Sequence, residues 1–382
     1  MPKVIPYGRQ NITKDDLDAV AKALQHDFLT QGPQIGEFEE NFARYVGAKY
    51  AVAVNNGTTA LHLAYLSLNC GPGDTIITTP ITFAATANAA LYCGAKVEMA
   101  DVDPNTGLID LDVVESMLKN APEGKYKILS PVDLAGLPVD MERCRQLADK
   151  YDLGLIEDAC HAPGGSFVDS SGTLRKCGDG SLADIAIFSF HPVKHIACGE
   201  GGMVTTNDEA VAKRLRLLRS HGISKESMQE DHGGWYYEMQ ELGFNYRITD
   251  IQCALGNSQL KRAEQGVSRR REIAARYAQA FAGTAVKPLN LPENCNHAYH
   301  LFVVLLDNRK EVYDHLKSHS IFAQVHYIPL NFLPYFQSLG FAKGDFPNAE
   351  LYYSQCLSLP MYPTLTNEEQ DFVISKVLEV AQ

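Results

Sequence analysis

The middle of the chain alternates short apolar runs with helical patterns, and no other feature narrows the possible folds as much. Strands are predicted at residues 51–54, 75–78, 96–100, 127–131, 154–157, 183–190 and 202–206. Helices are predicted among them at residues 60–68, 84–92 and 141–151, and after the N-cap Asp110. Strands that are joined by helices form a mostly parallel sheet with helices on both faces. We therefore predict an α/β fold built on such a sheet.

Further helices are predicted before and after this region. Residues 1–12 form a polar arm, Thr13 caps a first helix in which Leu17 and Leu24 have helical spacing, and a second helix covers residues 35–46.

After the last strand, Asn207 is predicted to cap a helix that ends near residue 220. The polar stretch 221–243 contains the only tryptophan, Trp235, and is interpreted as an ordered loop or lid. A long helix, broken or continuous, is predicted over residues 249–281.

A domain boundary is predicted where prolines and asparagines cluster, at residues 283–296. Beyond it, strands are predicted at 300–306 and 322–327, and helices at 309–319 and from 367 onwards. A chain of 382 residues that is 45% hydrophobic can bury two cores. We expect residues 1–282 to form the arm and a large cofactor-binding domain, and residues 283–382 a small α+β domain.

Composition excludes several classes of function. The chain has 34 basic and 46 acidic residues, a net charge of -12, so a nucleic-acid partner is not expected. No apolar run is long enough for a membrane helix, and the first ten residues do not resemble a secretory signal. The nine cysteines are scattered without a C-x-x-C pair. We expect reduced thiols and a cytoplasmic protein without a membrane partner.

Lys194 occupies an unusual place in the sequence. The apolar run that begins at Ile187 stops at Pro192, which lacks a backbone N–H, and a second strand begins at Gly202. A lysine at such a strand end is a candidate to form a Schiff base with a carbonyl, and pyridoxal 5'-phosphate (PLP) is the usual partner when a carboxylate serves its ring nitrogen.

Asp158 is the candidate for that carboxylate. It ends the strand predicted at 154–157, and open parallel sheets place their sites at the carboxyl ends of strands. A carboxylate there keeps the pyridine nitrogen protonated, so that the ring accepts electrons. An isolated Asp after a strand often only caps a turn, but the combination with Lys194 favours the catalytic interpretation.

A phosphate site is predicted at the loop formed by residues 55–59. It lies between a strand and a helix, so the backbone N–H groups around Gly57 and the Thr58 hydroxyl can face a phosphate, with the helix dipole behind them. Ser189 offers a second hydroxyl from the strand that leads to Lys194. The plain alternative is a strand-to-helix cap.

Two further side chains are candidates for contact with the cofactor ring. Phe83 follows a strand and could stack on the ring, although a lone Phe is more often part of a core. His161 could touch the ring or its phenolic oxygen, or could simply be a hydrogen-bonded turn residue. His297 and His300 have no third ligand nearby in the sequence, so no metal site is predicted.

Five stretches together resemble the DegT/DnrJ/EryC family of nucleotide-sugar aminotransferases, and the similarity runs from Ile5 to the C-terminus. The stretches are Asn56-Gly57-Thr58-Thr59-Ala60-Leu61-His62, Glu157-Asp158-Ala159-Cys160-His161-Ala162, Phe188-Ser189-Phe190-His191-Pro192-Val193-Lys194, Gly199-Glu200-Gly201-Gly202 and Gly243-Phe244-Asn245-Tyr246-Arg247-Ile248-Thr249-Asp250-Ile251-Gln252.

The resemblance implies a fold and a set of roles. It implies a PLP-dependent transferase of fold type I, like aspartate aminotransferase, that forms a homodimer with active sites at the subunit interface. Lys194 would be the Schiff-base lysine and proton shuttle, and Asp158 would hold the pyridine nitrogen. Ser189 and Thr58 would bind the phosphate, and Asn245 would reach the phosphate of the other subunit.

Three segments resemble one branch of the family, the UDP-4-amino-4,6-dideoxy-N-acetyl-β-L-altrosamine transaminases of pseudaminic acid synthesis. They are Ser189-Phe190-His191-Pro192-Val193-Lys194-His195, the arm Pro6-Tyr7-Gly8 and the stretch His326-Tyr327-Ile328-Pro329. This implies transfer of the amino group of L-glutamate to C4 of a UDP-linked 4-keto-6-deoxy sugar, with pyridoxamine 5'-phosphate (PMP) as the intermediate form of the cofactor. Many relatives carry Gln in place of His161, which leaves the contact of this residue open. By similarity, the sugar-nucleotide pocket would be lined by Tyr7, Asp27, Phe28, Leu29, Thr30, His326, Tyr327, Ile328 and Pro329.

Alternatives remain within the same scaffold. They are aminotransferases for other nucleotide 4-keto sugars, such as a UDP-4-keto-pentose, PMP-dependent sugar dehydratases, and a non-enzymatic sensor with the same fold. A sensor would be expected to lose Asp158 or Lys194, and both are present. The dehydratases replace the lysine by histidine, so Lys194 argues against them. Pocket shape sets sugar stereochemistry, and short motifs do not encode it.

Overall fold

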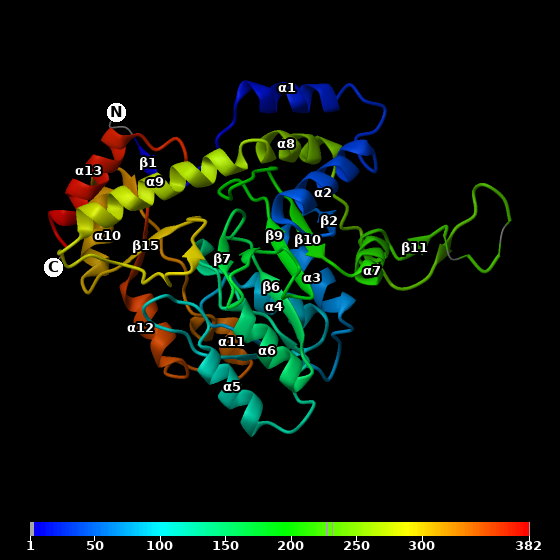
Figure 1. The fold of residues 1–382 in the computed structure, drawn as a ribbon, viewed down its shortest axis with the longest axis horizontal. Coiled ribbons are helices and arrows are strands. Elements are labelled where there is room, and N and C mark those ends of the chain that lie inside the picture. The colour runs from blue at the N-terminus through cyan, green and yellow to red at the C-terminus, as the bar shows by residue number, and fades with distance from the viewer. Residues whose placement is uncertain (1–3, 227, 231, 382) are drawn as a thin grey trace.

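The computed structural model describes residues 4–226, 228–230 and 232–381. At its centre is a seven-stranded sheet with the order β2-β10-β9-β6-β5-β3-β4 (Figure 1). Its strands are β2 (Tyr50–Val54), β3 (Thr75–Thr78), β4 (Lys96–Met99), β5 (Ile128–Leu129), β6 (Gly154–Asp158), β9 (Ile185–Ser189) and β10 (Gly202–Thr206). The strands from β9 to β4 are parallel and β10 runs antiparallel to both of its neighbours, which confirms the predicted mostly parallel sheet.

Helices cover both faces of this sheet because alternate strand residues point to opposite sides. Val52, Ile187 and Val204 share one core with the helices on the first face, whereas Ala51 and Phe188 belong to the core of the other face. The first face carries α3 (Gly57–Ser67), α4 (Ala85–Tyr92) and α7 (Glu209–Arg219). The second face carries α2 (Pro33–Val46), α8 (Asp250–Leu260), α5 (Leu111–Asn120) and α6 (Met141–Tyr151).

The C-terminal part builds a separate core around an antiparallel sheet with the order β13-β15-β17. Its elements are β13 (Lys287–Pro288), β15 (Phe302–Leu305), α10 (Arg309–Ser318), β16 (Ile321–Phe322), α11 (Pro334–Ser338), α12 (Pro347–Gln355), β17 (Cys356–Leu359) and α13 (Asn367–Leu378), with a 3-10 turn at Leu330–Phe332. The N-terminal strand β1 (Ile5–Pro6) pairs with β16, and α9 (Ala263–Phe281) packs on the same core. The arm and α9 therefore tie the C-terminal part to the rest of the chain.

Helix α1 (Lys14–Ala23) packs on α8 (Figure 1). The face that it turns inwards is not the predicted apolar one. Leu17 and Leu24 are 64% and 56% exposed, whereas Asp16 is fully buried. The Asp16 carboxylate accepts hydrogen bonds from Gln259 at 2.9 Å and from Arg262 at 2.5 Å. These polar contacts orient the helix, so the predicted apolar stripe faces outwards.

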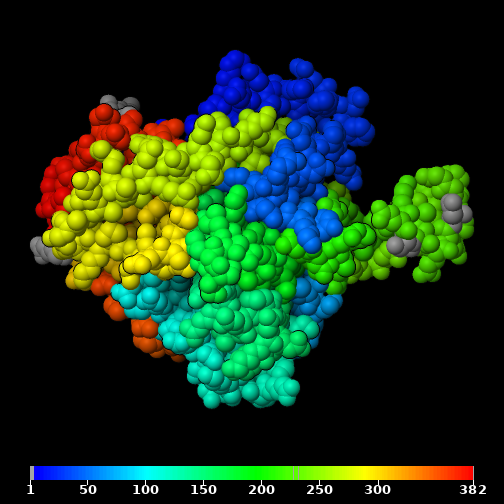
Figure 2. All heavy atoms as spheres, viewed as in Figure 1, coloured from blue at the N-terminus to red at the C-terminus, as the bar shows by residue number. Residues whose placement is uncertain are grey.

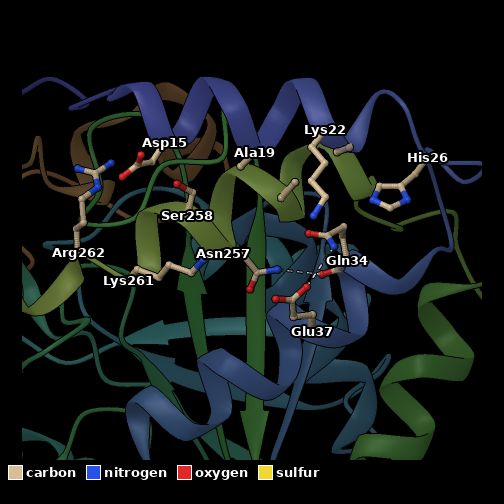
Figure 3. A pocket seen from close by; sticks show the side chains of 12 residues that line it. Asp15, Ala19, Lys22, His26, Gln34, Glu37, Asn257, Ser258, Lys261 and Arg262 are labelled. Carbon is tan, nitrogen blue, oxygen red and sulfur yellow. Dashed lines mark hydrogen bonds between the residues drawn. The ribbon is translucent and has the colours of Figure 1, made fainter.

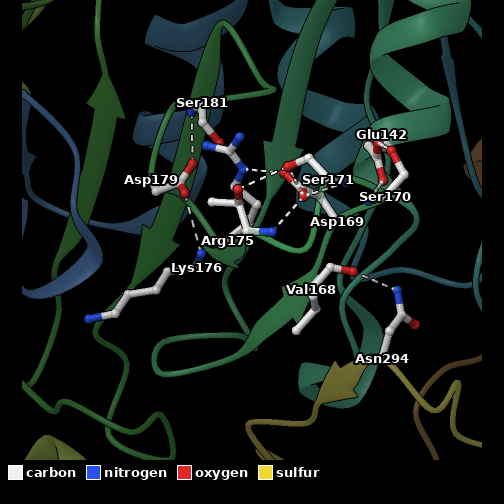
Figure 4. Close-up of polar contacts among 11 residues, drawn as sticks. Glu142, Val168, Asp169, Ser170, Ser171, Arg175, Lys176, Asp179, Ser181 and Asn294 are labelled. Carbon is white, nitrogen blue, oxygen red and sulfur yellow. Dashed lines mark hydrogen bonds and ion pairs between the residues drawn. The ribbon is translucent and has the colours of Figure 1, made fainter.

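A small sheet of β7 (Ser166–Val168), β8 (Leu174–Lys176) and β14 (Cys295–Asn296) joins the C-terminal part to the large unit. Figure 4 shows the turn between β7 and β8, in which the Asp169 carboxylate accepts hydrogen bonds from Ser171, Thr173 and Arg175. The Asn294 amide donates a hydrogen bond to the Val168 carbonyl at 3.0 Å and so links the segment before β14 to β7.

The stretch 221–243 contains a short hairpin, β11 (Ile223–Ser224) and β12 (Glu238–Met239), and projects from the body of the molecule (Figures 1 and 2). Trp235 within it is 78% exposed. Residues 227 and 231 of this predicted loop lie outside the described part. None of the helices in the described residues is long and apolar enough to span a membrane.

Other predicted element ends differ from the structure. Asp208, not Asn207, caps α7, because its carboxylate accepts hydrogen bonds from the N–H groups of Ala210 and Val211. Asn207 instead binds the N–H of Lys49. The long predicted helix is broken into α8 and α9. The strand expected at 322–327 ends at Phe322, where its pairing with the two-residue strand β1 stops.

Candidate active site

Lys194 lies in the connection between β9 and β10, at the carboxyl end of β9. This connection is closed by hydrogen bonds from the N–H of Phe190 to the Gly201 carbonyl and from the N–H of Cys198 to the Phe190 carbonyl. The Nζ atom of Lys194 lies 3.5 Å from Nε2 of His300. Burial lowers the pKa of Lys194 to about 8, against the opposing effect of the Cys160 thiol and the Asp158 carboxylate. A lysine in this state is readily available as a neutral, nucleophilic amine.

Asp158 ends β6, which lies parallel to β9, so both chain ends reach the same edge of the sheet. Its carboxylate accepts hydrogen bonds from Thr86 Oγ1 at 2.8 Å and from the N–H of Cys160 at 3.2 Å. Burial raises the pKa of Asp158, whereas these two donors and the positive charge of Lys194 lower it. The result is a buried acid that is held in place by fixed donors beside the lysine.

The N-terminus of α3 lies against the end of β9. The helix begins at Gly57, earlier than the predicted Ala60, because the Asn56 side chain caps it by accepting a hydrogen bond from the N–H of Thr59. A Cβ atom on Gly57 would lie 3.0 Å from Cβ of Ser189, so only glycine leaves space here without a shift of its neighbour. The first-turn N–H groups at Gly57 and Thr58 lack intrahelical acceptors, which suits an anion.

Gly202 contributes to the same close packing. A Cβ atom on this residue would lie 2.4 Å from the carbonyl oxygen of Asn56, so the start of β10 and the start of α3 touch backbone to backbone. The amine, the buried acid and the helix N-terminus thus surround one place, and they match the aldehyde, the pyridine nitrogen and the phosphate of PLP. The residues present fit this cofactor.

His161 and Tyr327 lie beside Lys194. Nδ1 of His161 accepts a hydrogen bond from the N–H of Ala135 at 3.1 Å, and its Nε2 lies 3.1 Å from the Tyr327 hydroxyl. Burial lowers the pKa of His161 well below its usual value, and the charge of Lys194 lowers it further. Phe83 is 63% exposed, and the centroid of its ring lies 6.1 Å from that of Tyr327.

The stretch 326–329 adjoins the N-terminal arm. The rings of Tyr7 and His326 have centroids 5.4 Å apart, and the Tyr7 carbonyl accepts a hydrogen bond from the N–H of Met361. His326 is buried, and its Nδ1 lies 2.8 Å from the Ser358 hydroxyl. Ile328 is exposed and Pro329 is buried. The structure thus brings together Tyr7 and the second group of predicted sugar-binding residues.

The predicted residues Asp27, Phe28, Leu29 and Thr30 lie elsewhere, exposed at the start of α8. The Leu29 carbonyl accepts a hydrogen bond from the N–H of Asp250, and Thr30 pairs with Thr249.

Asn245 is also exposed in this chain, and its segment passes the start of α3, where the N–H of Asn55 donates to the Tyr246 carbonyl at 3.0 Å. The contribution of Asn245 and of residues 27–30 to a partner's site stays a prediction.

Sequence reasoning missed two groups that the structure places in the site. Thr86 donates to Asp158 from the first turns of α4, and its only signal was a hydroxyl in the helix that follows a predicted strand. Ala135 holds His161 through a backbone group, which no side-chain pattern reveals. His300, considered only as a metal ligand, contacts Lys194.

Two cavities lie near the N-terminal region. One of about 260 Å³ is lined by Lys194 and His195 together with arm residues and Arg270. Another of about 300 Å³ lies between α1, α2 and α8, and Figure 3 shows Lys22, Glu37 and Asn257 around it. Neither Lys194 nor Asp158 lines this second cavity, which separates it from the site described above.

Residues 10–378 match the model of the DegT/DnrJ/EryC1/StrS aminotransferase family. The chain belongs to this family. It is 38% identical over 386 residues to the UDP-4-amino-4,6-dideoxy-N-acetyl-beta-L-altrosamine transaminase of Campylobacter jejuni, with 99% of this chain and 98% of the relative covered.

Solved structures agree with the family assignment. Helicobacter pylori PseC, an aminotransferase involved in the biosynthesis of pseudoaminic acid, has a TM-score of 0.89 and 32% identity, with 99% of each chain covered. The PLP form of Spr1654 from Streptococcus pneumoniae has a TM-score of 0.89 and 29% identity, with 98% of each chain covered, and a PMP form of it is equally similar.

These findings confirm the predicted PLP-dependent transferase fold of the aspartate aminotransferase type. The family member described here is a PLP-dependent nucleotide-sugar transaminase, and its cofactor alternates between PLP and PMP.

Proposed function

We propose that the protein transfers the amino group of L-glutamate to C4 of a UDP-linked 4-keto-6-deoxy-N-acetylhexosamine. The product would be UDP-4-amino-4,6-dideoxy-N-acetyl-β-L-altrosamine, an intermediate of pseudaminic acid synthesis. The similarity to the Campylobacter jejuni transaminase and to PseC over nearly the whole chain supports this substrate.

One observation carries the reaction type: a half-buried lysine amine, whose pKa is lowered to about 8, lies at the same edge of the sheet as a buried carboxylate. An amine that is partly neutral near pH 7 can take and return a proton within one catalytic cycle. A dehydratase of this scaffold has histidine in place of the lysine. Lys194 therefore favours transamination over dehydration.

Each residue near Lys194 has a role in this proposal. PLP, when bound, supplies an electron sink for the carbon that loses its proton. In the glutamate half-reaction Nζ of Lys194 would take the proton from Cα and pass it to the cofactor. In the sugar half-reaction it would take a proton back from the cofactor and pass it to C4 of the sugar. Asp158 keeps the pyridine nitrogen protonated.

The remaining contacts with the cofactor are assigned by position. The first turn of α3, with Gly57 and Thr58, holds the phosphate together with the Ser189 hydroxyl. Phe83 stacks on the face of the ring, and His161 lies at its edge.

The sugar-nucleotide pocket would be formed by Tyr7 and the stretch 326–329 of one subunit. Asn245 and residues 27–30 are exposed in the single chain. We propose that in a homodimer Asn245 reaches the cofactor phosphate of the second subunit and residues 27–30 complete its sugar-nucleotide pocket. We further propose that residues 1–282 and 283–382 are the two domains. The nine scattered cysteines support a reducing compartment such as the cytoplasm.

The substrate is tested with a panel of UDP-4-keto sugars that includes the proposed hexosamine and a UDP-4-keto-pentose. Purified protein loaded with PLP is incubated with each sugar and ¹⁵N-labelled L-glutamate, and Lys194→Ala is the matched control. We expect ¹⁵N at C4 of the hexosamine, with the configuration read by NMR. A clear preference for the pentose, or loss of water without nitrogen transfer, would contradict the proposal.

The shared site is tested by complementation. Lys194→Ala and Asn245→Ala subunits, once each is confirmed to be inactive alone, are co-expressed with different tags and the heterodimer is purified. It contains one site with both groups intact, so activity should return. Verified heterodimers that stay as inactive as their parents would exclude a site shared through Asn245.

A further inference from the structure

Ala135 holds a strained backbone conformation beside the active site. It lies in the 3-10 turn Leu134–Gly136 with φ 61° and ψ -3°, a left-handed conformation that costs about 1 kcal/mol or more for a residue with a Cβ atom. In this conformation its N–H donates a hydrogen bond to Nδ1 of His161 at 3.1 Å.

Hydrogen bonds with the surrounding backbone hold this turn in place. The Ala135 carbonyl accepts a hydrogen bond from the N–H of Leu301 at 3.1 Å, and the Gly136 carbonyl accepts one from the N–H of Ala298 at 2.9 Å. The loop is closed at its base because the Asp133 carboxylate accepts a hydrogen bond from the N–H of Val139 at 2.9 Å. Strain that is fixed in this way usually serves a site.

The contact determines where His161 carries its proton. A backbone N–H can only donate, so Nδ1 of His161 must be the unprotonated nitrogen. Burial and the nearby charge of Lys194 lower the pKa of His161 and keep the ring neutral. A neutral imidazole has one N–H, which is therefore on Nε2.

The N–H on Nε2 of His161 fixes the orientation of the Tyr327 hydroxyl. Nε2 of His161 lies 3.1 Å from the Tyr327 hydroxyl, and because this nitrogen donates, the phenol oxygen accepts. The proton of the phenol must then point to another acceptor. No such acceptor for it is present in the part of the chain that the structure describes. Burial raises the pKa of Tyr327, so the phenol keeps its proton.

We propose that Ala135, His161 and Tyr327 form a one-way hydrogen-bond chain whose last member donates to a neutral oxygen of the bound keto sugar. This rests on the function proposed above. An uncharged donor suits a carbonyl or hydroxyl oxygen of the sugar, whereas a carboxylate of glutamate is better matched by a cation. Tyr327 also follows His326, which contacts the ring of Tyr7, on the side assigned to the sugar.

The first test does not depend on activity. Nitrogen-proton correlation NMR of the cofactor-free protein with ¹⁵N-labelled histidine identifies the protonated nitrogen of each ring, and the His161 signals are assigned by their loss in His161→Gln. We expect a proton on Nε2 and none on Nδ1 at neutral pH. A proton on Nδ1, or a doubly protonated ring, would overturn the proposal.

The second test separates the two half-reactions. Conversion of the cofactor by glutamate is followed by absorbance without sugar, and conversion of PMP by the keto sugar is followed separately. In Tyr327→Phe and in His161→Met, the sugar half-reaction should lose roughly fivefold to tenfold more kcat/KM than the glutamate half-reaction, as for one lost hydrogen bond. His161→Gln matches Met in shape but can accept and donate, so it should recover most of the loss.

A double variant decides whether the two side chains act in series. His161→Met combined with Tyr327→Phe should be no worse than Tyr327→Phe alone, because the chain is already broken. Additive losses, or equal losses in both half-reactions, would overturn the proposal, and thermal unfolding shows that each variant is folded. If the wild type transfers no amino group to any UDP-keto sugar, the proposed function is wrong. The NMR experiment still tests the position of the proton on His161 in that case.

Discussion

Replacing Thr86 by valine tests how the protein keeps Asp158 charged. The Thr86 hydroxyl donates to the Asp158 carboxylate at 2.8 Å, and this contact lowers a pKa that burial raises. Valine has nearly the shape of threonine and no donor, so the carboxylate loses a hydrogen bond while the packing is preserved.

The size of the effect follows from that one bond. A hydrogen bond to a charged group contributes about 1.5–3 kcal/mol, and each 1.36 kcal/mol corresponds to about one pKa unit. The Asp158 carboxylate keeps its hydrogen bond from the N–H of Cys160 in this variant, which favours the lower end of this range. We expect the pKa of Asp158 to rise by about one unit.

The direction of the shift in the pH profile follows from the negative charge that Asp158 needs for catalysis. A higher pKa means that Asp158 is neutralised at a higher pH, so the acid limb of the rate profile should move upwards by about one pH unit in Thr86→Val. The assay is kcat/KM for glutamate at saturating PLP from pH 5 to 9, with Thr86→Ser as the matched control that keeps the hydroxyl. An unchanged acid limb in Thr86→Val, or an equal shift in Thr86→Ser, would refute the reasoning.

Three further predictions follow from the same site. Lys194→Ala should lose both the visible absorption of the bound cofactor and turnover. Full transaminase activity in this variant would show that Lys194 is not the Schiff-base lysine. Asp158→Asn should still bind PLP at saturating concentration, since the phosphate is held separately, but should nearly lose turnover; a rate within about threefold, under about 1 kcal/mol, would make Asp158 merely structural. Burial raises the pKa of Asp133 to about 6 and that of Glu157 well above its usual range, so both folded carboxyls hold protons that the unfolded chain releases near pH 4. Stability should therefore fall as pH rises from about 4 through 6 and further, until Glu157 also loses its proton. Glu157→Gln removes the contribution of Glu157, so its melting temperature should fall less from about pH 4 to 6 than that of the wild type, and parallel curves would contradict the interpretation.

Local sequence patterns predicted most of the fold. The errors at two helix starts came from competing local signals, and the error at α1 came from a tertiary contact. Gly57 is a poor helix former, so the predicted start of the helix fell at Ala60, although the Asn56 cap begins it at Gly57. Asn207 and Asp208 are both good caps, and only the loop geometry selects Asp208. The polar contacts of Asp16 with α8 overrode the apolar spacing of α1, which no helix taken alone could reveal.

The placement of Lys194 and Asp158 at one edge of the sheet was determined by the sequence, because parallel strands end on the same side and each residue follows its own strand. What only the tertiary structure decided is how these groups are held. Thr86 reaches Asp158 across 72 residues, and Tyr327 reaches His161 across 166. The N–H of Ala135 reaches His161 through a left-handed backbone that the neighbouring strands and turns impose. Contacts of this kind depend on the order of strands in the sheet and on backbone donors. Neither can be inferred from the spacing of side chains in the sequence.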